Sequence, residues 1–110
     1  MQEKVYDAVW SGDRKPGADG KLPPVVNTVD VKKASFTNTI GAPELITVWT
    51  DPEFDPALKA FYYARVIEIP TPRWTAFDAA YFKEAKFTDD VPMTMTERAY
   101  SSPIWYGPAK

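Results

Sequence analysis

The chain has 110 residues with a formal net charge of −2, and 45% of its residues are hydrophobic. This length allows one domain with a core of its own, and the hydrophobic content excludes an intrinsically disordered chain. Because the sequence contains neither cysteine nor histidine, disulfides, thiolate chemistry, histidine-containing triads and the common zinc sites are excluded.

The first half of the chain predicts short strands separated by turns. The side chains of Lys4–Trp10 alternate between two faces, which predicts a strand. Ser11–Pro24, with three glycines and three prolines, predicts a long exposed loop. Val25–Thr39 is rich in β-branched residues and predicts one long strand or two short strands broken by a bulge. A turn at Gly41–Glu44 then leads into another predicted strand at Leu45–Thr50.

The second half predicts the clearest strand and the only helix. Alternation along Ala60–Ile69 places Phe61, Tyr63, Arg65, Ile67 and Ile69 on one face, and we expect one face to pack on a core and the other to form an interface. Thr75–Lys86 predicts a helix with Thr75 as its N-cap and with the rings of Trp74, Phe77 and Tyr81 on one side. Ile104–Tyr106 predicts a last strand.

These elements predict a mainly β fold. Most connections are too short for helical crossovers, so the strands should pair in an antiparallel manner. We therefore expect a single domain over residues 1–110, an antiparallel β-sandwich or open barrel of about five to six strands with one short helix. The direct entry from Met1 into a strand-like run, without a signal peptide, leads us to expect a fragment of a larger protein.

The segment Trp49–Pro56, which we call the acidic turn, is the one stretch with the spacing of a metal site. It carries three carboxylates at alternate positions, those of Asp51, Glu53 and Asp55. Calcium loops open in this way, but Pro56 stands where such a loop needs glycine and Tyr62 where it needs a closing glutamate. We favour a rigid turn in which the aspartates bond nearby backbone N–H groups, and assign no metal site.

A ligand-binding function has few further candidates. Tyr62 and Trp74 are the rings we consider for stacking on a sugar, beside the carboxylates of the acidic turn. No catalytic residue and no cofactor is assigned, since a proline-stiffened turn does not build the cleft that a pair of catalytic carboxylates requires. The lysines and arginines form no basic stripe, and no apolar run reaches the roughly 20 residues of a membrane span, so neither nucleic acid nor a membrane span is expected.

Four segments together resemble a known family. These are Ala8–Arg14, Gly41–Pro56, Ala60–Trp74 and Glu97–Tyr106. In this order they are similar to the C-terminal part of a bacterial family, number 3604 among domains of unknown function. The resemblance implies a longer, exported or periplasmic parent whose N-terminal part is similar to barrel-shaped metal-dependent hydrolases with histidine and aspartate ligands. No such ligand falls on this chain.

Two functions follow as hypotheses. The first is a non-catalytic C-terminal accessory or interaction domain of a larger, hydrolase-like bacterial protein, not an enzyme by itself. Its partners would be the remainder of the parent or, through an exposed face, a second copy. The alternative is a small module of an exported protein that binds sugar or calcium.

Overall fold

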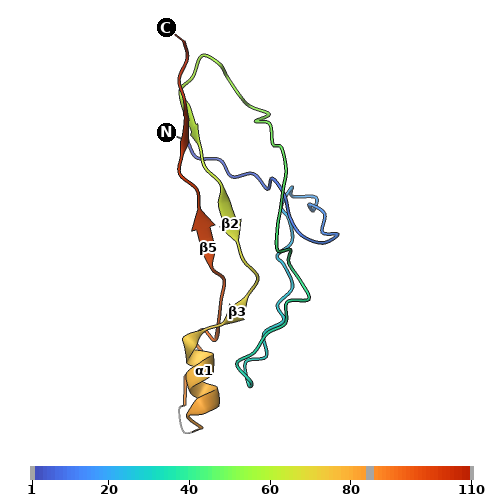
Figure 1. Cartoon of the computed structure of the whole chain (residues 1–110), viewed down its shortest axis with the longest axis vertical. Coiled ribbons are helices and arrows are strands. Elements are labelled where there is room, and N and C mark those ends of the chain that lie inside the picture. The colour runs from blue at the N-terminus through green and yellow to red at the C-terminus, as the bar shows by residue number, and fades with distance from the viewer. Residues whose placement is uncertain (1, 84–85, 110) are drawn as a thin grey trace.

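One long antiparallel ribbon with a helix at its tip dominates the computed structural model, which describes residues 2–83 and 86–109 (Figure 1). Its elements in chain order are β1 (Ala60–Tyr62), β2 (Arg65–Ile67), β3 (Thr71–Pro72), α1 (Trp74–Tyr81), β4 (Thr94–Met95), β5 (Arg98–Tyr100) and β6 (Ile104–Tyr106). The strand β1 pairs with β6, β2 with β5 and β3 with β4, all antiparallel. The predicted mainly β, antiparallel character with one short helix is therefore confirmed.

Two compensating bulges divide the ribbon into these three pairs. Between the first and second pairs, residues 63–64 on one side oppose residues 101–103 on the other. Between the second and third pairs, residues 68–70 oppose residues 96–97, so the extra residue lies on the other side. Each bulge contains a proline, Pro103 or Pro70, which cannot donate a ladder hydrogen bond. The predicted strand Ala60–Ile69 is thus real but is broken after Tyr62.

The helix α1 is shorter than predicted and is not capped by Thr75. It runs from Trp74 to Tyr81 with Arg73 at the N-cap position and no side-chain cap. The Thr75 hydroxyl instead donates to the Pro92 carbonyl at 2.6 Å, which attaches the helix to the returning side of the ribbon. Of the predicted extension to Lys86, residues 84–85 lie outside the described residues. No helix in the described chain is long and apolar enough to cross a membrane.

The strands predicted in the first half of the chain are wrong. Lys4–Trp10 and Leu45–Thr50 run outside any sheet, and Val25–Thr39 forms only an isolated bridge between Asp30 and Ser35. A high β-propensity reflects packing against neighbouring strands, and these segments have no strand beside them. Residues 11–24 form the expected turn-rich loop.

The chain closes almost no core. Pro72, Thr75 and Ala76 alone are buried among the described residues, all near the junction of β3 and α1. The radius of gyration is 19.1 Å, against about 13 Å for a compact domain of this length. The accessible surface is 9572 Å², whereas a compact monomer of 12.4 kDa exposes about 6,100 Å². Within the described residues the three two-stranded sheets neither stack as a sandwich nor close as a barrel.

Candidate functional site

The acidic turn is held by its own aspartates. The Asp51 carboxylate accepts the backbone N–H of Glu53 at 2.9 Å, and the Asp55 carboxylate accepts that of Ala57 at 2.8 Å. Both are contacts from an aspartate to the backbone two residues on, the usual way in which this side chain stabilises a turn. The predicted turn, with its aspartates bonded to nearby backbone N–H groups, is confirmed.

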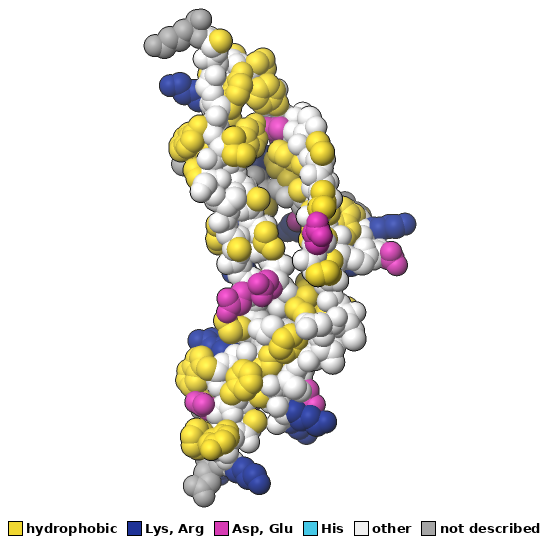
Figure 2. Space-filling view, viewed as in Figure 1, with side chains coloured by type: hydrophobic (Ala, Val, Ile, Leu, Met, Phe, Trp, Pro, Cys, Tyr) yellow, Lys and Arg dark blue, Asp and Glu magenta, His cyan; other side chains and the backbone are white. Residues whose placement is uncertain are grey.

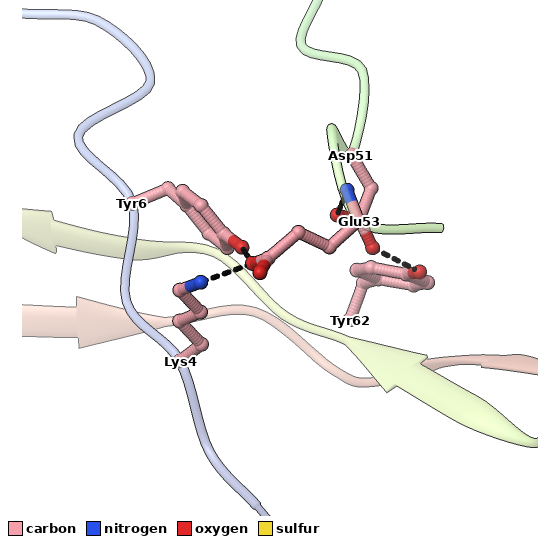
Figure 3. A network of polar contacts seen from close by, with 5 residues as sticks. All are labelled: Lys4, Tyr6, Asp51, Glu53 and Tyr62. Atoms are coloured by element: carbon pink, nitrogen blue, oxygen red, sulfur yellow. Dashed lines mark hydrogen bonds and ion pairs between the residues drawn. The ribbon is translucent and has the colours of Figure 1, made fainter. Parts of the chain in front are cut away.

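Polar contacts tie the acidic turn to the N-terminal segment and to β1 (Figure 3). The Lys4 ammonium and the Tyr6 hydroxyl both donate to the Glu53 carboxylate. The Tyr62 hydroxyl donates to the second Asp51 oxygen at 2.8 Å. The acidic turn therefore lies between two segments that are distant in sequence.

These contacts shift the titration of the groups that form them. The hydrogen bonds from Lys4 and then Tyr6 lower the pKa of the Glu53 carboxyl, and the same contact with Glu53 raises the pKa of Lys4. Donation to a carboxylate raises the pKa of the Tyr6 and Tyr62 hydroxyls, because the neutral hydroxyl is the donor. At neutral pH these pKa shifts keep the Glu53 carboxylate and the Lys4 ammonium charged and both tyrosine hydroxyls protonated. These are the states in which the hydrogen bonds form.

An aromatic layer covers this network. The Trp49 ring lies between Tyr6, with centroids 5.0 Å apart, and Tyr62, at 6.3 Å. On the same side of the ribbon Phe54 packs edge-on against Tyr106 at 4.9 Å, and the Tyr106 hydroxyl donates to the Pro56 carbonyl at 3.0 Å. One face of the β1–β6 pair is thus partly covered by the acidic turn.

The predicted ligand-binding residues do not form one site. Asp51, Glu53 and Tyr62 come together, but Asp55 serves its own turn, and Trp74 starts α1 at the other end of the ribbon (Figure 1). Within the described residues no group of three or more acidic side chains is arranged to hold a metal ion. Binding of sugar or calcium by these residues stays a prediction.

A more extensive feature is the opposite face of the ribbon. We call it the aromatic–arginine face and define it by Phe61, Tyr63, Arg65, Ile67, Arg98, Tyr100 and Trp105. Phe61 and Trp105 are cross-strand partners with rings 5.0 Å apart. Tyr63 continues the row, 6.3 Å from Phe61 and 6.2 Å from Tyr100. Four rings therefore run in a line across β1, β2 and their partner strands.

Most of this face is open to solvent, although Phe61 is half-buried and the Tyr63 hydroxyl donates to the Glu3 carboxylate at 2.6 Å. The exposed fractions are 74% for Trp105, 60% for Tyr100, 56% for Ile67 and 40% for Tyr63. Hydrophobic side chains lie on the surface from one end of the molecule to the other in the space-filling view (Figure 2). An exposed apolar surface that is much larger than a few scattered residues marks an interaction site.

Two arginines lie in the same face and form no ion pair with any residue that the structure describes. The register places Arg65 opposite Tyr100 and Arg98 opposite Ile67, so the two arginines are diagonal neighbours. Neither arginine takes part in an ion pair within the described part of the chain, where the pairs are Lys4 with Glu53 and Lys33 with Asp30. The face thus combines aromatic rings with two charges that are available to another surface.

Sequence reasoning found only half of this face. The alternation in Ala60–Ile69 places Phe61, Tyr63, Arg65 and Ile67 together, as the sequence predicts. Whether Trp105 shares this face with Tyr100 and Arg98 depends on the first bulge, which places one extra residue between them on the returning side of the ribbon. Pro103 marks this bulge in the sequence, because a proline cannot donate a ladder hydrogen bond.

A shallow hollow lies beside the N-terminal segment. It has a volume of about 460 Å³ and is lined by Tyr6, Trp10 and Trp49 with Asp7 and Lys21 at its polar side. The Tyr6 hydroxyl, the one phenol in its lining, already donates to the Glu53 carboxylate. Its residues give no support to a reaction.

Comparison with known proteins identifies one family. The family described as "Protein of unknown function (DUF3604)" matches residues 1–108, which is nearly the whole chain. No curated protein and no solved structure matches the chain.

Proposed function

We propose, from the premise that the chain belongs to the DUF3604 family of unknown function, that it is a non-catalytic accessory domain that packs against the remainder of a larger protein. The contact is made through the aromatic–arginine face. The parent is a bacterial, exported protein of which this is the C-terminal part, as the family resemblance implies.

The observation that carries this proposal is the missing core. Folding buries three of the residues that the structure describes, while the rings of Tyr63, Tyr100 and Trp105 stay exposed to water. An isolated two-stranded ribbon is marginally stable in water, and three or more strands with a covered apolar face are needed for independent stability. A partner surface that covers these rings would supply the missing burial.

The composition of the face favours a protein partner. Interfaces are enriched in tyrosine, tryptophan, phenylalanine and arginine, and the residues that contribute most to binding are tryptophan, tyrosine and arginine. Tyr100, Trp105 and the two arginines have this character. The partner surface should be apolar with carboxylates placed to receive Arg65 and Arg98, because a buried unpaired guanidinium is strongly unfavourable.

The proposal also accounts for the shape of the chain. An antiparallel sandwich would arise when strands of the parent stack on the ribbon and cover the face. The exposed rings of Trp74, Phe77 and Tyr81 on α1 would belong to the same contact.

Mutation of the face in the longer protein tests this proposal. The double variant Tyr100→Ser with Trp105→Ser should lower the melting temperature of the longer protein by several degrees, since two buried rings are removed. The matched control is Val26→Ser, which removes a side chain that is also exposed here but lies outside the face. Equal, small shifts for both variants would contradict the proposal.

A further inference from the structure

We propose that two copies of this chain associate edge to edge through β5, antiparallel and with the two-fold axis at Ala99, to form a four-stranded sheet. This goes beyond the proposed function, because it uses the backbone edge of β5, whereas the accessory contact uses the side chains of the face.

The backbone of β5 has an unpaired edge. The Ser101 N–H donates to the Ala64 carbonyl at 2.9 Å, and the Glu68 N–H donates to the Glu97 carbonyl at 3.1 Å. In an antiparallel pair the hydrogen-bonded residues alternate, so Ala99 also points its N–H and C=O toward β2. The N–H and C=O groups of Arg98 and Tyr100 therefore point away from β2, and no other described segment bonds to them.

The edge of β5 is more accessible than that of β2. In Figure 1 the blue N-terminal stretch crosses the ribbon above β5, and the rest of the first half of the chain runs on the side of β2, away from β5. Beyond the end of β2, Gly41 approaches Ile69 so closely that an added Cβ would lie 2.7 Å from the Ile69 side chain. The stretch from Met93 to Ser102 contains no proline and no lysine, the residues that protect natural edges.

The cross-strand neighbours of Arg98 favour the register in which the two-fold axis lies at Ala99. With the axis at Ala99, Arg98 of one copy lies opposite Tyr100 of the other, and the outward groups of both residues exchange hydrogen bonds. Each guanidinium then lies beside a ring, which is a favourable cation–π arrangement. A shift that places Arg98 directly opposite Arg98 would bring these like charges closer than the diagonal positions that they hold with the axis at Ala99, and is disfavoured.

The number of strands favours a second copy as the occupant of this edge. Two strands are too few for a stable isolated sheet, and pairing through β5 supplies four. The aromatic–arginine faces of the two copies would then lie on the same side and form one continuous face.

A single introduced cysteine tests the register, because the chain has none of its own. Ala99→Cys places two thiols in a non-hydrogen-bonded pair across the axis, with Cα atoms about 4.5 Å apart, within the range that a disulfide spans. The purified chain carrying Ala99→Cys should form a covalent dimer in a glutathione redox buffer. The control is Val66→Cys, which places the thiol on the cross-strand partner of Ala99 and on the other edge strand. It should stay largely uncrosslinked.

Proline substitution tests the edge itself. Arg98→Pro removes an outward N–H that the ribbon does not use, and should raise the dimer dissociation constant at least tenfold by sedimentation equilibrium, roughly the loss of two hydrogen bonds per dimer. Ile67→Pro makes the same change at the cross-strand partner and should have little effect. Three outcomes would each overturn the proposal. The two proline variants could raise the dissociation constant equally, the two cysteine variants could crosslink equally, or the wild-type chain could be monomeric at about 100 μM.

The outcome is separable from that of the proposed function. Crosslinking at position 99 can succeed while the serine variants of the face leave the longer protein unaffected, and the reverse can also occur. A failure of one therefore does not imply a failure of the other.

Discussion

Removal of the Trp105 indole should cost the isolated chain little stability, because the ring is 74% exposed. About a quarter of a tryptophan surface of about 250 Å² is buried, which corresponds to about 65 Å² and about 1.6 kcal/mol. The ring pair with Phe61, at 5.0 Å, adds about 0.5 kcal/mol. We therefore expect Trp105→Ala to lower the free energy of opening of the β-ribbon by about 2 kcal/mol at most.

The same change should cost far more where the face is covered. Full burial of the ring is worth about 6 kcal/mol by the same reckoning. The assay is hydrogen exchange at the Ser101 amide, whose bond to Ala64 reports on opening of the ribbon. The control is Ile104→Ala, which removes a side chain of similar exposure, 72%, from the other face. A loss of 4 kcal/mol or more in the isolated chain would show that Trp105 is already buried, and would refute the open face.

Three further predictions concern the acidic turn and the helix. Because the pKa of Glu53 is lowered in the folded chain, the stability it contributes is present above its ordinary value of about 4.3 and is lost as the pH falls through the folded-state value. The Tyr6 ring resonances should report this release in NMR spectra, and Glu53→Gln should abolish the transition. Thr75→Val should destabilise the tip by about 1–3 kcal/mol in hydrogen exchange, since the Pro92 carbonyl loses its donor; an unchanged tip would contradict this role of the hydroxyl. Calcium at millimolar concentration should leave the thermal transition unchanged, because both Asp51 oxygens already accept hydrogen bonds; a clear upward shift would favour the ligand-binding alternative.

The sequence predicts the ribbon better than any other part of the fold. Its alternation and its prolines are local signals, and Ala60–Ile69 and Ile104–Tyr106 both contain strands. The same signals fail at Lys4–Trp10 and Leu45–Thr50, since a strand requires a neighbour and local pattern does not show whether the chain supplies one. If the parent supplies those neighbours, these segments are the places where it would do so.

The candidate site was predicted in the same partial way. The spacing of aspartates and prolines correctly indicated a turn stabilised by Asp51 and Asp55. It did not indicate that Lys4 and Tyr6 would reach Glu53, because contacts between residues some 50 positions apart depend on the path of the whole chain. The open face was hidden for a different reason. Amphipathic alternation indicates which side chains share a face, but not whether anything covers it.

The most direct measurement is hydroxyl-radical footprinting of the aromatic–arginine face in the isolated chain and in the longer protein. The account predicts that Trp105, Tyr100 and Tyr63 are oxidised readily in the isolated chain and are protected at least about tenfold in the longer protein, because their rings are buried there. Tyr62, already packed against Trp49, should change much less. Equal oxidation of the three face residues in both contexts would contradict the account.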